Sequence, residues 1–168
     1  ATSTANRALL DAVKDLPGLE IADLHALYPD GTIDAEAEAA RLLAADRLIL
    51  QFPMYWYSTP PILKQWQDSV LTPILYIHPE IGARLKGLPL RVVTTTSGEP
   101  EAYREDGRVG FTVEQLLAPL HATARRTGLV WETPFVVHDM RAPSAEALAA
   151  HASRYRALLA GTELAIAA

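Results

Sequence analysis

The chain has 168 residues with a formal net charge of -5, and hydrophobic residues make up 49% of it, enough for one folded domain with a sizeable core. Its acidic balance, without a Lys/Arg cluster, argues against nucleic-acid binding. The absence of cysteine excludes disulfides, a thiolate nucleophile and Cys-ligated metals, and it suits a reducing cytoplasm, where we expect the protein to lie.

Short strands and helices alternate along the sequence. Near-continuous apolar runs predict strands at 19–24, 48–52, 90–95 and 135–138. Helical spacing and capping signals predict helices at 6–14, 35–45, 62–71, 112–128 and 145–159. This alternation predicts one α/β domain over residues 1–168, with a doubly wound parallel sheet.

The start of the sequence is unusual for such a sheet. The chain opens on a helix cap, ATSTAN, with no strand before it. In the flavodoxin-like strand order 2-1-3-4-5 the first strand is central. We therefore expect either further residues upstream of Ala1 or another element that fills the gap.

Three stretches carry chemistry at the edge where ligands bind in α/β sheets, beyond the carboxyl ends of the strands. In the first, ATSTAN, Ser3, Thr4 and Asn6 offer hydroxyl, amide and backbone N–H groups at a helix N-terminus. Such a terminus suits a phosphate, and the same residue types are also ordinary helix caps.

The second stretch, PMYWYSTPP, places three aromatic rings in a turn after the strand that ends at Phe52. Such rings can wall a flat ligand, cover the core or form a subunit interface. The third, TTSGEPEAY, offers a loop of small residues followed by a phenol, or else an ordinary polar connection. Together the three stretches indicate a ligand with a phosphate at one end and a flat ring at the other, the shape of flavin mononucleotide.

Longer motifs carry a family resemblance. LQFPMYWYSTPPILKQWQDSVL is similar to the signature FP…W…P..LK.W.D.V of the flavodoxin-like NAD(P)H:quinone oxidoreductases. TTSGEPEAY resembles that family's Thr-Thr-Gly-Gly loop with its following tyrosine, and FTVEQLLAPLHATARRTGLVWETPFVVH resembles its closing helix, Gly turn and Pro-Phe strand. The resemblance covers nearly the whole chain, and LYPDGTID is similar to the group that includes the ancillary oxidoreductase of glutathione-gated potassium efflux.

The resemblance implies an enzyme that passes a hydride from NAD(P)H by way of a flavin, FMN rather than FAD, to a quinone. It implies that the isoalloxazine ring is lined, largely by backbone groups, by Pro53, Met54, Tyr55, Trp56 and Tyr57. Its pyrimidine side would be bordered by Thr95, Thr96, Ser97 and Gly98. Tyr103 would sit over the place shared by nicotinamide and quinone, and Ser3 and Asn6 would hold the phosphate. The signature residues Lys64, Trp66 and Asp68 are interpreted as structural.

The resemblance also implies partners. We expect a homodimer with its contact near the apolar segment 71–84, and a potassium efflux transporter is a further expected partner, which would place the protein at the inner membrane. A regulatory subunit with secondary or lost enzyme activity, and an azo- or nitroreductase that uses the same flavin, stay open as alternatives.

Three departures from the family pattern bear on the site. Ser97 stands where glycine is usual, which would be strained at a positive φ. Val109 stands six residues beyond the tyrosine, where some quinone reductases have a histidine. PILYIHPEIGAR replaces a Gly-Phe-Ala-Tyr-Gly stretch that helps to shape the substrate pocket or the dimer contact.

Two other kinds of site are disfavoured. A hydrolase built on Ser97, His138 and Asp139 lacks the G-x-S-x-G turn that would expose the nucleophile. A metal site needs clustered ligands, and the histidines are scattered along the sequence at His25, His78, His121, His138 and His151.

Overall fold

The computed structural model describes residues 3–161. One parallel sheet is built from β1 (Leu48–Pro53), β2 (Pro89–Thr95), β3 (Val130–Trp131) and β4 (Phe135–Val137). β2 is central, because β1 pairs along one of its edges and both β3 and β4 pair along the other. Pro134, which has no N–H to donate, lies between the two short strands and interrupts what would otherwise be one ladder.

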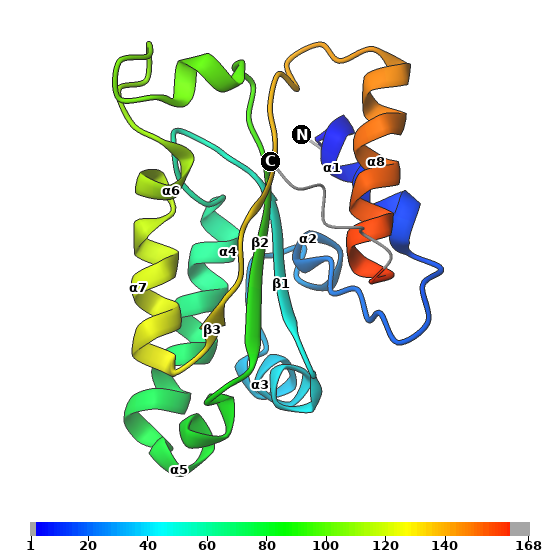
Figure 1. Ribbon diagram of the computed structural model, residues 1–168. Coiled ribbons are helices and arrows are strands. Elements are labelled where there is room, and N and C mark those ends of the chain that lie inside the picture. Colours follow the sequence, from blue (N-terminus) through cyan, green and yellow to red (C-terminus); the bar gives the residue numbers. More distant parts are fainter. Residues whose placement is uncertain (1–2, 162–168) are drawn as a thin grey trace.

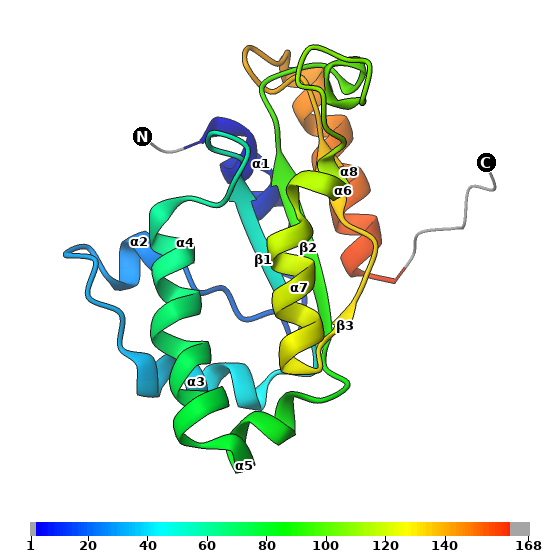
Figure 2. The same ribbon diagram turned by 90° about the vertical axis from the view of Figure 1, so that its left-hand side faces the viewer.

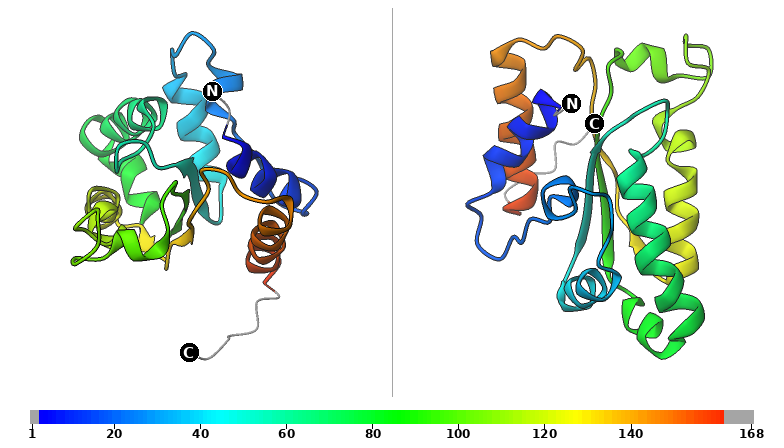
Figure 3. Two further views of the ribbon diagram at one scale, coloured as in Figure 1. Left: turned by 90° about the horizontal axis from the view of Figure 1, so that it is seen from above. Right: turned by 180° about the vertical axis from the view of Figure 1, so that it is seen from behind.

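Helices cover both faces of the sheet (Figures 1 and 3). One face carries α1 (Thr4–Val13) and α8 (Ala145–Leu159), which pack against each other. The other carries α4 (Pro61–Trp66), α6 (Val113–Leu116) and α7 (Ala118–Thr127), as Figure 2 shows from the front. Two further helices lie on the outside of this layer: α2 (Leu24–Leu27) packs against α4, and α3 (Ala35–Ala44) packs against residues 67–71, which continue α4. The short helix α5 (Pro79–Gly82) packs against residues 73–77 and 83–85 on either side of it in the chain. This is the predicted doubly wound α/β architecture.

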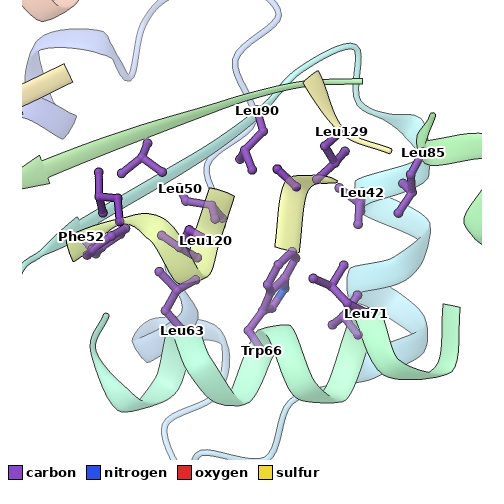
Figure 4. Close-up of a cluster of buried hydrophobic side chains, with 14 of the residues drawn as sticks. Leu42, Leu50, Phe52, Leu63, Trp66, Leu71, Leu85, Leu90, Leu120 and Leu129 are labelled. Carbon is purple, nitrogen blue, oxygen red and sulfur yellow. The ribbon is translucent and has the colours of Figure 1, made fainter. Parts of the chain in front are cut away.

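The two helix layers enclose separate cores because side chains of β2 alternate between its faces. Leu90 and Val92 point into the larger core under α4 and α7, whereas Val93 joins the smaller core under α1 and α8. Figure 4 shows Trp66 and the leucines of several elements converging in the larger core.

A buried carboxylate ties α2, α3 and α4 together. Glu38 is 3% exposed and accepts hydrogen bonds from the Trp66 indole Nε1–H and the Tyr28 hydroxyl, both at 2.9 Å, and from Arg41. Tyr28 ends α2, Arg41 lies in α3 and Trp66 lies in α4, so the three donors come from three elements. Because Arg41 pairs with the buried carboxylate and both of its oxygens accept hydrogen bonds, the charge of Glu38 is compensated. Trp66 is thus structural, as the sequence predicted. Lys64 and Asp68 form an exposed ion pair on the outer surface of the helix, with Nζ and Oδ1 2.5 Å apart.

The capping predictions are confirmed. Ser144 and Asp34 cap α8 and α3, the Thr112–Gln115 capping box opens α6, and Gly128 ends α7 in the left-handed conformation with φ +77°. The helix predicted over 112–128 is nevertheless broken at Leu117, because Pro119 has no N–H to bond the carbonyl of Gln115. The helix predicted to end at residue 71 continues through two turns of π-type hydrogen bonding, η1 (Gln67–Leu71) and η2 (Pro73–Ile77).

The prediction of a strand at residues 19–24 is wrong. Residues 19–23 form no regular element, although Asp23 itself has extended backbone, and helix α2 then begins at Leu24. An extended segment becomes a strand only when a neighbouring strand satisfies its backbone groups. In residues 3–161 no strand lies beside this segment, and β1 pairs with β2 alone. Within the same residues none of the helices combines the length and the apolar character that crossing a bilayer requires.

Candidate functional site

The three stretches singled out from the sequence meet around the end of β2. The Asn6 side-chain Nδ2 donates a hydrogen bond to Thr95 Oγ1 at 2.8 Å, and the Met54 N–H donates to the Thr95 carbonyl at 2.9 Å. Gln51 Nε2 in β1 donates to the Asn6 carbonyl at 2.9 Å. The start of α1 and the loops after β1 and β2 therefore lie together at the carboxyl edge of the sheet, the upper end in Figures 1 and 2. The predicted meeting of the three stretches is confirmed.

Ser3 and Asn6 form the cap of α1. Ser3 Oγ accepts from the Asn6 N–H at 3.3 Å and from Asn6 Nδ2 at 3.2 Å. Ser3 is therefore the N-cap of α1, as one interpretation of the sequence predicted. The backbone N–H groups of Thr4 and Ala5, in the first turn, have no acceptor within the helix. Asn6 Oδ1 is buried without a hydrogen-bond partner among residues 3–161. This end of α1 retains both donors and an acceptor for a bound anion or hydroxyl.

The aromatic turn after β1 is a two-residue hairpin. The Tyr55 N–H donates to the Ser58 carbonyl and the Ser58 N–H to the Tyr55 carbonyl, each at 3.0 Å. Trp56 and Tyr57 between them have positive φ angles of 47° and 65°. Positive φ at both central residues is the type I′ pattern, which Asn-Gly adopts readily and side chains with a large Cβ substituent do not. Strain of this kind concentrates at functional sites.

The rings of this turn are not part of a core. Trp56 is 93% exposed, and Tyr55 and Tyr57 are each 44% exposed, so the alternative that Trp56 covers the core is contradicted. In the described chain the N–H groups of Trp56 and Tyr57 find no acceptor. Met54, which precedes the three aromatic residues, is partly buried and packs against the larger core. The turn thus offers flat apolar surface beside free backbone donors.

The loop after β2 is held close to its neighbours. The Thr96 N–H donates to the Val137 carbonyl at 2.9 Å, and Thr96 Oγ1 donates to the Gly98 carbonyl at 3.0 Å. Ser97 has no positive φ and its side chain is exposed, so the strain expected from serine at this position does not arise. A Cβ added to Gly98 would lie 3.1 Å from Arg108 Nη2 and 3.4 Å from the Tyr103 ring. A side chain at 98 would thus be crowded mainly by the end of the exposed Arg108 side chain.

Tyr103 ends the short 3₁₀ turn η4 (Pro100–Tyr103) and is half-buried against the larger core. Its ring lies against the imidazole of His138, with ring centroids 5.4 Å apart. His138 Nδ1 in turn lies 3.0 Å from Thr96 Oγ1. Desolvation by burial lowers the pKa of His138 from its ordinary value of 6.5.

The sequence named His138 only in the disfavoured hydrolase arrangement and among five scattered histidines, and did not predict that it lies against Tyr103. Its position directly after the last strand was the signal that could have placed it at the carboxyl edge of the sheet. It bonds Thr96 and not Ser97, which leaves the disfavoured hydrolase arrangement without a base for its serine. Among residues 3–161 no group of three acidic or histidine side chains is arranged to hold a metal ion.

Comparison with known proteins defines the family. A family model described as flavodoxin-like fold matches residues 1–159, and the chain belongs to this family. The chain is 42% identical to the glutathione-regulated potassium-efflux system ancillary protein KefF of Klebsiella pneumoniae, over 92% of this chain and 85% of the relative. It is 36% identical to the NAD(P)H oxidoreductase YdeQ of Bacillus subtilis, itself uncharacterized, over 97% of this chain and 82% of that protein. These relatives indicate an oxidoreductase.

Solved structures share the fold. A thermophilic tryptophan halogenase from Streptomycin violaceusniger superposes with a TM-score of 0.88 at 36% identity, covering 94% of this chain and 91% of that one. The general stress protein 14 of Treponema denticola, in complex with FMN, superposes with a TM-score of 0.85 at 33% identity, covering 96% and 92%. An NADPH-quinone reductase of P.pentosaceus has a TM-score of 0.79 at 25% identity, covering 93% and 89%. Relatives at similar distances thus carry different activities, and the site must decide among them.

Proposed function

We propose that this chain is an FMN-dependent NAD(P)H:quinone oxidoreductase, which moves a hydride from NAD(P)H to a quinone. The observation that carries the proposal is the meeting of the capped start of α1, the strained aromatic turn and the Thr95–Gly98 loop around Thr95. The relatives named as oxidoreductases and the FMN complex of a protein with 33% identity support it.

The residues present fit FMN. The N–H groups of Thr4 and Ala5 would hold the phosphate end, at the helix start that Ser3 and Asn6 cap, and the unpaired Asn6 Oδ1 would accept a hydrogen bond from a hydroxyl of the ligand. Pro53, Met54, Tyr55, Trp56 and Tyr57 would line the isoalloxazine ring, with Thr95, Thr96, Ser97 and Gly98 along its pyrimidine edge. Bound FMN would supply the two-electron carrier, and the protein would supply position, donors and exclusion of water. FAD is disfavoured because no further segment suited to adenine is apparent in the sequence.

The side chain we assign to the reacting substrates is that of Tyr103. Its ring lies beside Gly98 and against the ring of His138. A phenol there can donate a hydrogen bond to a quinone oxygen as negative charge develops on it. Nicotinamide and quinone would occupy this place in turn.

The test is to purify the full chain, release any bound flavin by heat and identify it by chromatography. Steady-state turnover with NADH or NADPH is then measured against benzoquinone, an azo dye and a nitroarene. FMN with preference for the quinone supports the proposal. FAD, no flavin after reconstitution, or preference for the azo dye or nitroarene contradicts it.

A regulatory role on a potassium efflux transporter is the second candidate function. It is favoured by the 42% identity to an ancillary protein of glutathione-regulated potassium efflux. Co-purification with such a transporter, and efflux at the parental level with a Tyr103→Phe variant whose turnover is reduced roughly tenfold, would identify this role as separate from catalysis.

We also propose a homodimer that uses the segment 71–84. Tyr76 and Ile77 in η2 are each 66% exposed, and the Arg126 guanidinium lies 5.3 Å from the centre of the Tyr76 ring. Exposed apolar surface of this kind is typical of interfaces, where aromatic residues and arginine are enriched.

A further inference from the structure

His138 joins two loops of the site that are far apart in sequence. Its Nδ1 lies 3.0 Å from Thr96 Oγ1, 42 positions away, and its ring lies against Tyr103. The backbone around it is bonded to the same loop: the Asp139 N–H donates to the Gly98 carbonyl and the Met140 N–H to the Thr96 carbonyl, each at 2.9 Å. The imidazole thus stands between the end of β2 and the phenol of Tyr103.

The Thr96 hydroxyl lies between two hydrogen-bonding groups. Its Oγ1 is 3.0 Å from the Gly98 carbonyl, to which it donates, and 3.0 Å from His138 Nδ1. When the imidazole is protonated both of its nitrogens are donors, so in the cation Nδ1 donates to Thr96 Oγ1 while the Thr96 hydroxyl donates to Gly98.

Backbone strain marks the same place. Asp139, next to His138, has a φ of +59°, one of three non-glycine residues in the described chain with a positive φ. The other two are Trp56 and Tyr57, in the aromatic turn at the same edge of the sheet. Strained backbone is maintained where the surrounding structure requires it, and it clusters at functional sites.

We infer that His138 is a titrating positioning residue of this site, which holds the Gly98 loop against the Tyr103 ring and sets a positive charge beside the phenol when the imidazole is protonated. The inference rests on the proposed function, since that assigns Tyr103 to the substrate. A quinone that receives one hydride needs one proton to become the hydroquinone. The phenol O–H of Tyr103 gives this proton to the quinone oxygen and regains one from solvent, and a nearby imidazolium makes the phenol the stronger acid.

The charges around the imidazole set where it titrates. Burial lowers its pKa and is the largest effect, while Glu101 from η4 and Glu114 from α6 oppose it by favouring the cation. His151 from α8 lowers the pKa further, and Asp139 is its neighbour in the chain. The cation therefore forms below 6.5, the ordinary pKa of histidine. Turnover is expected to rise as the pH falls through the lowered pKa.

Two substitutions separate the hydrogen bond from the charge. His138→Asn retains an N–H donor for Thr96 and loses the titrating ring, whereas His138→Phe retains the ring contact with Tyr103 and loses the donor. His25→Asn, at an exposed residue of α2, is the matched control. The kcat and KM of quinone reduction are measured across about pH 5 to 8, where histidine titrates. Both His138 variants should lose the rise in kcat at low pH, by on the order of 3- to 10-fold, while the control follows the parent.

A spectroscopic measurement makes the outcome independent of turnover. Histidine NMR signals of the flavin-free chain are titrated in the parent, Tyr103→Ala and Thr96→Val. The His138 signal should titrate below 6.5, and its pKa should shift in both variants. A pKa at or above the ordinary value that neither variant moves overturns the inference, as does a pH profile of kcat in His138→Asn equal to that of the parent. Absence of flavin or of quinone turnover in the parent overturns the proposed function and leaves the NMR test to decide on His138.

Discussion

Replacing Trp56 by asparagine should make the flavin-free protein more stable and bind flavin less well. Trp56 has a φ of +47°, in a turn whose two central residues both need positive φ. The left-handed conformation costs an ordinary L residue roughly 1–2 kcal/mol, and asparagine tolerates it at this position of a type I′ turn. Since the ring is 93% exposed, its removal forfeits almost no burial.

The expected gain is about 1 kcal/mol in the free energy of unfolding, which corresponds to a rise of roughly 2–4 °C in Tm for a chain of this size. Trp56→Ala is the matched control, because it removes the same ring but lacks the short polar side chain through which asparagine tolerates the left-handed conformation. Its stability should stay within about 0.5 kcal/mol of the parent. Both variants should bind FMN more weakly, by about 5- to 150-fold, if the ring stacks on the flavin with the ~1–3 kcal/mol typical of such contacts.

Urea denaturation and thermal melts of flavin-free protein measure the first effect, and quenching of FMN fluorescence measures the second. If Trp56→Asn is no more stable than Trp56→Ala, the argument from strain is wrong. If both lose about 3 kcal/mol or more, the ring packs in a core in spite of its exposure. Unchanged FMN affinity in both would remove Trp56 from the proposed flavin site.

Four further predictions concern single residues. Glu38→Ala should lower the free energy of unfolding by about 3–5 kcal/mol in urea denaturation, because it leaves the buried donors of Glu38 without an acceptor. Glu36→Ala, at an exposed position of the same helix, is the control and should have little effect. An equal loss in both variants would contradict the structural role of the hydrogen bonds to Glu38. Burial lowers the pKa of His151 in the folded chain, so the unfolded chain takes up this proton first as the pH falls. The contribution of neutral His151 to the free energy of unfolding should be fully present above pH 6.5 and decline below it. His151→Leu should flatten that decline in urea denaturation measured across the same pH range. Tyr76→Asp should convert the proposed homodimer to a monomer in light scattering, and a parent that is itself monomeric at micromolar concentration refutes the proposed interface. Tyr103→Phe should reduce quinone turnover roughly tenfold, about 1.4 kcal/mol, with FMN affinity unchanged, and parental turnover would exclude the hydroxyl from the reaction.

Local signals explain most of what could be predicted from the sequence. The helix caps at Ser144, Thr112 and Gly128 each depend on atoms within four residues, so the local sequence is sufficient to predict them. The apolar runs predicted β1 and β2 because a strand covered on both faces needs apolar residues throughout. The alternation of strands and helices then placed the three site stretches at one edge.

Contacts between distant residues determined the rest. The strand predicted at 19–24 had a suitable sequence and found no neighbouring strand, since pairing depends on another segment. The bond between Asn6 and Thr95 spans 89 positions, and that between Thr96 and His138 spans 42, so a local pattern could place His138 at the edge of the sheet but could not show that it contacts Thr96 and Tyr103. The strain at Trp56 likewise comes from closing the hairpin, because its local sequence prefers other turns. The sequence by itself thus determined most of the elements and the edge at which the three stretches meet, whereas only the tertiary structure decided which side chains contact one another there, since that depends on how separate loops pack.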